Sequence, residues 1–139
     1  MVKVPEEIKN LISKQSLPNF TGLPMATSDT SGTPNVIYVL ACWWSDDETL
    51  CVVDNFLNKT RKNLDANPKA SFACWDQETG KSYQIKCDAK VLTEGPLYEE
   101  GHKKAQANEP PLPGKAVIAC KVTDIYQALY GPGAGDKLY

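Results

Sequence analysis

The chain is poor in histidine, the commonest metal ligand in proteins. Its 139 residues include one histidine, His102, and its five cysteines form no CxxC pair. The clustered ligands of a zinc site are therefore missing, and the odd number of thiols argues against a closed disulfide framework. We expect no metal site. The cysteines all lie in apolar runs and are predicted to be reduced and buried, like small hydrophobic residues: Cys42, Cys51, Cys74, Cys87 and Cys120.

Long apolar runs and an excess of positive charge are also missing. No stretch approaches 18 uninterrupted apolar residues, and the first residues lack the apolar run of a secretory signal. Lys and Arg number 15 against 17 Asp and Glu, a formal net charge of −2, which leaves no general cationic surface for a nucleic-acid backbone. These absences predict a cytoplasmic protein that binds neither membranes nor nucleic acids.

The composition that remains is that of an ordinary globular protein. Hydrophobic residues make up 42% of the chain and charged residues 23%, both within the range of folded domains. A chain of this length is about one domain long and can bury a conventional core. We therefore expect a single domain over residues 1–139.

Most of the chain has the pattern of short β-strands. Six segments are rich in β-branched or aromatic residues or alternate between apolar and polar positions, and short turns separate most of them. Helical spacing appears over about 5–15, 58–67 and 97–107. Short connections favour antiparallel pairing, so the pattern predicts a mainly β protein, a six-stranded antiparallel barrel with short flanking helices. The six strands are expected near residues 25–28, 35–44, 49–54, 70–75, 82–92 and 115–130.

The segment from Asn35 to Trp44 is apolar on both faces of the expected strand. A strand at the surface of one domain normally shows a polar face, so something besides the domain core must cover the second face. We expect either a flat aromatic ligand or a second subunit there.

A candidate anion site lies where the chain changes from strand to helix, at Asn58-Lys59-Thr60-Arg61. The first turn of a helix has unpaired N–H groups, and the hydroxyl and cations beside them would suit a phosphate. The alternative is a solvated helix start whose basic side chains stay in water. Gln84, on the polar face of the alternating strand, carries an amide that can donate to and accept from a carbonyl and imide edge; as an alternative it is an ordinary surface residue.

Together these segments resemble the pyridoxamine 5'-phosphate oxidase-like FMN-binding split-barrel family, in its short, general flavoprotein type. The resemblance extends over about residues 5–130 and implies a six-stranded split barrel, a homodimer, and FMN in each of two grooves at the subunit interface. It is carried by Val52 through Ala70, by Trp75, by Tyr83 through Cys87, and by Ala26-Thr27 with Asp29, Gly32 and Pro34.

The resemblance also implies which residues contact the cofactor. Lys59 and Thr60, with Asn58 before them, match the phosphate-holding positions, and Gln84 matches the glutamine that approaches the flavin. Tyr83 stands where that family motif has an arginine. The remaining implied contacts are one strand along the isoalloxazine, Val36, Ile37, Tyr38 and Val39, and one segment beside the cofactor, Val53 and Asp54.

The expected function is that of a flavin-dependent oxidoreductase, passing electrons or hydride between a reduced small-molecule donor and a small acceptor. Alternatives are an FMN-binding electron carrier without its own substrate, or a split barrel that binds a deazaflavin or haem. Pyridoxamine phosphate oxidation is not expected, because the Arg-, His- and Trp-rich C-terminal segment of those oxidases has no counterpart before Tyr139. No residue stands out as catalytic, and His102 is expected to be an ordinary surface histidine.

Overall fold

The computed structural model describes residues 2–16 and 21–139. These residues form a mainly β fold, as the sequence pattern predicted, with three short helices. The elements in chain order are α1 (Glu6–Gln15), β1 (Leu23–Ser28), β2 (Pro34–Val39), β3 (Cys42–Trp44), β4 (Thr49–Asp54), α2 (Lys59–Ala66), β5 (Lys69–Trp75), β6 (Ser82–Leu92), α3 (Pro96–Gln106) and β7 (Ala116–Gln127).

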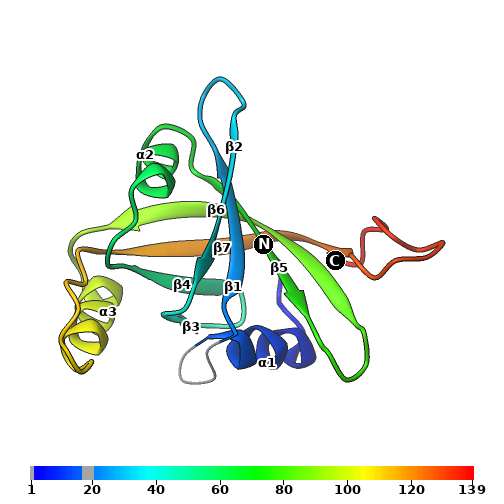
Figure 1. Ribbon diagram of the computed structural model, residues 1–139, viewed down its shortest axis with the longest axis horizontal. Coiled ribbons are helices and arrows are strands. Elements are labelled where there is room, and N and C mark those ends of the chain that lie inside the picture. The colour runs from blue at the N-terminus through cyan, green and yellow to red at the C-terminus, as the bar shows by residue number, and fades with distance from the viewer. Residues whose placement is uncertain (1, 17–20) are drawn as a thin grey trace.

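All the strands belong to one antiparallel sheet in the order β2-β1-β5-β6-β7-β4-β3. β2 and β3 lie at opposite edges of this sheet, although only Leu40 and Ala41 separate them in the chain. Val39 and Cys42 are three residue steps apart and can be separated by at most about 11 Å, so the sheet must curl until its edges approach each other. The result is the curled half-barrel of a split-barrel fold (Figure 1).

The sequence predicted six strands, and this count is wrong by one. The apolar stretch 35–44 forms two strands, because its first half pairs with β1 and its second half with β4. Between them the Val53 amide donates a 2.9 Å hydrogen bond to the Ala41 carbonyl oxygen, which directs the chain from one edge to the other. Composition alone did not reveal the break, since both halves are equally apolar.

The core lies inside the curl. In β6, Ile85, Cys87 and Ala89 are buried and Gln84 and Lys86 are exposed, which confirms the predicted alternation. β4 is buried at every position, because β7 and β3 flank it in the sheet and α3 packs against it.

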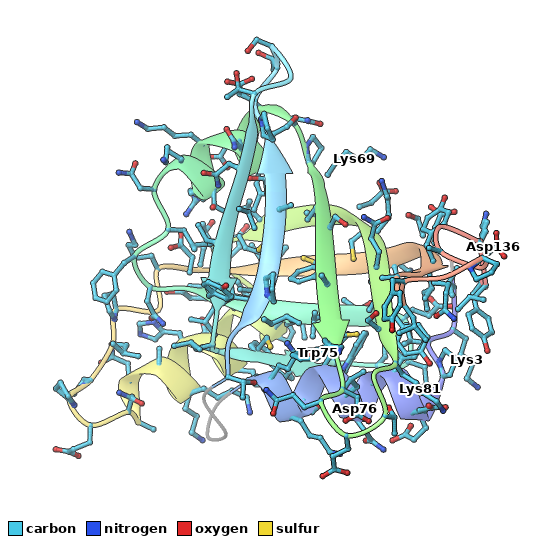
Figure 2. The ribbon with its side chains drawn as sticks, turned by 45° about the vertical axis from the view of Figure 1, so that its right-hand side comes forward. Lys3, Lys69, Trp75, Asp76, Lys81 and Asp136 are labelled. Carbon is cyan, nitrogen blue, oxygen red and sulfur yellow. The ribbon has the colours of Figure 1, made fainter. Side chains whose placement is uncertain are left out.

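The helices close the open ends of the barrel. α1 lies at one end and α2 at the other, while α3 lies beside the ends of β4 and β7 (Figure 1). The buried residues of α1 are Ile8, Leu11 and Ile12, the predicted apolar face. The β5–β6 hairpin reaches the α1 end, where Lys81 pairs with Glu7 at 2.8 Å (Figure 2). Among the described residues, no helix is long and apolar enough to cross a membrane.

The five cysteines are free, and four of them are buried, as predicted; Cys42 is only partly covered. Burial away from water disfavours the thiolate. It raises the pKa of Cys42 to about 11 and that of Cys74 to about 12, and it raises the pKa of Cys120 well above its ordinary value. These thiols stay protonated at neutral pH.

Candidate functional site

The loop between β4 and α2 folds around a buried carboxylate. Asp54 ends β4 with no exposed surface. One of its oxygens accepts a 3.0 Å hydrogen bond from the Leu57 amide, and the other accepts from Arg61 Nη1 at 2.9 Å. Both oxygens are therefore engaged in holding the loop against the helix. The Arg61 guanidinium is neutralised by this pair and by Asp65 at 3.4 Å.

The start of α2 carries unpaired positive charge. Asn58 is the N-cap residue, as predicted, but its side chain makes no capping hydrogen bond, and the first turn holds no acidic residue. Among the described residues, neither Lys59 nor Lys62 forms an ion pair. The free N–H groups of a first helical turn add a partial positive charge. An anion at this point would meet amides and at least one free ammonium.

A buried polar cluster attaches α2 to the sheet. Thr60 is 2% exposed, and its Oγ1 accepts a hydrogen bond from Asn35 Nδ2 of β2 at 3.0 Å. One turn later, Asn63 Nδ2 donates to Thr27 Oγ1 of β1 at 3.1 Å. These contacts fix the helix start relative to two strands.

A surface cavity of about 180 Å³ opens beside this helix start. It brings together four of the sequence-predicted residues, Ile37, Asn58, Lys59 and Thr60. Its lining combines the cation of Lys59 and several polar groups with apolar side chains, a mixture that suits a ligand with a charged tail and a flat body. The complete lining is Asn35, Ile37, Phe56, Leu57, Asn58, Lys59 and Thr60.

Other predicted residues lie elsewhere. Val36 and Tyr38 project from the opposite face of β2, where they are 69% and 73% exposed. Val39 is buried in the core. Val53 is buried too and contributes to the lining of a second cavity, of about 230 Å³, that includes Trp43 and two residues of α3, Lys104 and Ala105.

Gln84 is exposed on β6, in a third cavity shared with Lys86 and Tyr126. Three steps across the sheet separate its strand from β2. Within one chain, the structure does not bring Gln84 into the cavity beside α2.

Sequence reasoning missed three residues of the cavity, Asn35, Phe56 and Leu57. Asn35 had a detectable signal, since it lies two positions before Ile37 and therefore on the same face of the strand. Phe56 and Leu57 had none, because only the folded loop between β4 and α2 brings them to the cavity.

His102 differs from the exposed residue that was expected. It is half-buried in α3, its ring stacks on Tyr98 with centroids 5.5 Å apart, and its Nδ1 lies 2.9 Å from the Gly114 carbonyl oxygen. A carbonyl oxygen only accepts, so Nδ1 carries the donated hydrogen and Nε2 keeps its lone pair in the neutral ring. The cause is the loop after α3, which returns against the helix.

These observations define the class of protein. It is a split barrel in which an uncapped helix start lies beside a surface cavity. The family model described as pyridoxamine 5'-phosphate oxidase matches residues 5–128. The chain belongs to this family of split-barrel proteins.

The chain is similar in sequence to two known proteins. The chain is 34% identical over 116 residues to the uncharacterized protein MJ0282 of Methanocaldococcus jannaschii, covering 80% of this chain and 75% of that one. It is 31% identical in sequence to HupZ from Group A Streptococcus, and the crystal structure of HupZ superposes on this chain with a TM-score of 0.78. The match covers 95% of this chain and 99% of that one.

More distant solved structures share the fold. An FMN-binding protein from Syntrophomonas wolfei superposes with a TM-score of 0.73 at 16% identity, covering 90% of this chain and 88% of that one. HutZ, described as the haem storage protein of Vibrio cholerae, superposes with a TM-score of 0.63 at 17% identity, covering 92% and 97%.

Proposed function

We propose that this chain binds FMN, with the 5'-phosphate at the start of α2, and acts as a flavin-dependent redox protein. One observation carries the proposal: an uncapped helix start with an unpaired Lys59 lies at a cavity whose other walls are largely apolar. A helix N-terminus with a nearby cation suits a phosphate dianion. The Syntrophomonas relative, which is FMN-binding by name, shows that the fold accommodates this cofactor.

The size of the cavity argues for a second subunit. About 180 Å³ is less than the roughly 300 Å³ or more of a typical small-molecule site, so the cavity takes the phosphate tail and leaves the ring system outside. The neighbouring Val36, Tyr38 and Phe56 expose apolar surface. A homodimer that covers β2 would enclose the ring, and Gln84 would reach it from the partner subunit.

In this arrangement three kinds of contact hold the cofactor. Lys59 supplies the countercharge, the first turn of α2 supplies N–H donors, and Ile37 with Phe56 supplies apolar contact. FMN, when bound, supplies hydride and single-electron transfer. The protein contributes binding, orientation and exclusion of water.

The test compares FMN with riboflavin, which lacks the phosphate. Lys59→Ala is expected to weaken FMN binding by about 1.5–3 kcal/mol, the range for a hydrogen bond to a charged group, and to leave riboflavin affinity nearly unchanged. Flavin-fluorescence titration measures both. Lys90→Ala, an exposed lysine on β6, is the matched control. Equal losses for both ligands would show that Lys59 does not contact phosphate.

A turnover measurement distinguishes an enzyme from an electron carrier. NADH and NADPH as donors, with small quinones or dyes as acceptors, are added to the FMN-loaded protein under anaerobic conditions. Sustained donor oxidation identifies an oxidoreductase. A single stoichiometric reduction that depends on an added reductase identifies an electron carrier.

Haem is a second candidate, favoured by His102. Its Nδ1 is occupied by the Gly114 carbonyl oxygen, an arrangement that orients Nε2 as a metal ligand, and HutZ of the same fold is a haem storage protein by name. Haemin titration with a His102→Ala variant tests it. A Soret shift lost in this variant supports haem, whereas tight FMN binding without such a shift excludes it.

A further inference from the structure

We infer that Asn35 is a positioning residue that makes the Thr60 hydroxyl a donor toward the ligand, and so makes the cavity beside α2 selective for a phosphate dianion. This inference rests on the proposed FMN site. It assigns a role to a residue of β2 that is not expected to bind the phosphate itself.

The first step concerns what the Thr60 hydroxyl receives. Asn35 Nδ2 lies 3.0 Å from Thr60 Oγ1 and 3.5 Å from Thr27 Oγ1, and an amide nitrogen only donates. Thr27 Oγ1 already accepts a shorter bond from Asn63 Nδ2, at 3.1 Å. The N–H of Asn35 is therefore directed mainly at Thr60, whose oxygen acts as the acceptor.

The second step concerns the hydrogen of the same hydroxyl. Thr60 is 2% exposed, so bulk water does not satisfy it. Within residues 2–16 and 21–139, the one hydrogen-bond partner of Thr60 Oγ1 is the donor Asn35, and the hydroxyl itself donates to no acceptor there. Thr60 lines the cavity, and an acceptor for its hydrogen can come from a ligand there. A buried donor without an acceptor is costly, and a ligand oxygen beside Thr60 would remove that cost.

The third step concerns which ligand satisfies this hydroxyl. A phosphate dianion offers oxygens that only accept, and it pairs with a fixed donor without competition. A riboflavin hydroxyl or a protonated phosphate also carries a hydrogen and matches less well. Asn35 thus turns a hydroxyl that can both donate and accept into a directed donor, beside the charge of Lys59.

The main test is Asn35→Asp, which replaces the donor by a carboxylate of nearly the same shape. The carboxylate accepts the Thr60 hydrogen and removes it from the ligand. At pH 8 the FMN dissociation constant is expected to rise roughly 10- to 100-fold, with the riboflavin constant within about twofold. Asn63→Asp makes the same change one helical turn away, on an amide that bonds Thr27, and should cost FMN less than about threefold.

The pH dependence separates this role from a purely structural one. As pH falls from 8 to 5.5, the protonated fraction of the introduced carboxyl, which can again donate to Thr60, increases. The FMN dissociation constant of Asn35→Asp, divided by that of wild type, should therefore fall toward one. A ratio independent of pH would overturn the inference.

Asn35→Ala provides a second variant without added charge, and thermal melts check that each variant folds. Asn35→Ala is expected to weaken FMN binding about three- to tenfold. In a protein that already carries Thr60→Val, it should have no further effect on FMN binding. If wild type prefers FMN to riboflavin and Lys59→Ala removes this preference, but neither Asn35 variant changes it, the inference fails and the proposed function stands. If wild type shows no such preference, both fail.

Discussion

Single residues decide which charges at the start of α2 are free. Arg61 and Lys59 lie two positions apart, but Arg61 is held by Asp54 and Asp65, whereas Lys59 has no carboxylate partner among the described residues. The sequence shows three basic residues within four positions and does not reveal this division. It depends on where the β4 carboxylate lies after folding.

The Asp54–Arg61 pair leads to a stability prediction. Arg61→Ala leaves a fully buried carboxylate without its cation, and breaking a buried pair in this way costs about 3 kcal/mol. Urea unfolding at pH 7 measures the change. Arg61→Lys keeps the charge and should recover much of the loss. A change below about 0.5 kcal/mol in Arg61→Ala would mean that the pair contributes no stability.

Gly101 leads to a second prediction at this scale. A Cβ built there would lie 2.3 Å from Val117 Cγ2 and 3.0 Å from Trp43 Cη2, so the glycine allows α3 to approach the sheet. Gly101→Ala is expected to destabilise the protein by about 1–3 kcal/mol through overpacking, despite a gain of about 1 kcal/mol in helix propensity. Thermal and urea unfolding measure it.

Two further variants control the Gly101 experiment. Lys103→Ala, at an exposed position of the same helix, should have little effect. Val117→Ala should relieve part of the strain when combined with Gly101→Ala, so the double variant should be more stable than the sum of the two single changes. Strict additivity would contradict the predicted contact.

At the scale of elements, the strands place their thiols in the core. Cys51, Cys74, Cys87 and Cys120 lie on β4, β5, β6 and β7 and are buried. Their position in apolar runs predicted this burial correctly, whereas Cys42 on β3, which was predicted to be buried too, is only partly covered. The helices were also predicted to within one or two residues, because Pro5, Asn58 and Pro68 mark their ends.

The raised thiol pKa values predict alkaline sensitivity. Below the thiol pKa of the unfolded state, about 8.5, the thiol is protonated in both the folded and the unfolded state. Its contribution to the free energy of unfolding is then fully present. Between that value and the folded pKa, about 12 for Cys74, the unfolded state has lost protons that the folded state retains. The free energy of unfolding therefore falls as pH rises, by at most about 1.4 kcal/mol per pH unit for each thiol.

Urea titrations at pH 8, 9 and 10 measure this loss. Cys74→Ala removes one titrating group, so its stability should decline less steeply between pH 9 and 10 than that of wild type. Lysines and tyrosines titrate in both proteins and cancel in the comparison. Parallel declines would indicate that Cys74 does not contribute.

For the whole molecule, the exposed apolar side chains of β2 predict self-association. Val36→Lys is expected to convert a dimer at micromolar concentration into a monomer, since a cation would be placed in the proposed subunit interface. Its folding stability should change by less than about 0.5 kcal/mol, because the side chain is exposed within one chain. Sedimentation velocity measures the assembly, and Tyr130→Lys, at another exposed apolar residue, is the control. A wild-type monomer would contradict the prediction.

FMN binding should follow the assembly. If the ring lies between two subunits, Val36→Lys weakens FMN binding even though Val36 does not line the cavity beside α2. Titration at protein concentrations above and below the dimer midpoint separates lost assembly from lost contact. Unchanged affinity in a monomeric variant would show that one chain suffices.

The sequence by itself determined the fold class, most of the strands, the helices and the position of the strand-to-helix junction at Asn58, because these follow from local periodicity, turn residues and helix-end residues. The tertiary structure decided which of those residues meet. It split the stretch 35–44 between the two edges of the sheet, engaged Arg61 with Asp54, brought Asn35 to Thr60, and kept Gln84 away from Lys59. These outcomes depend on how the sheet curls, which is a property of all its strands together and of no short segment.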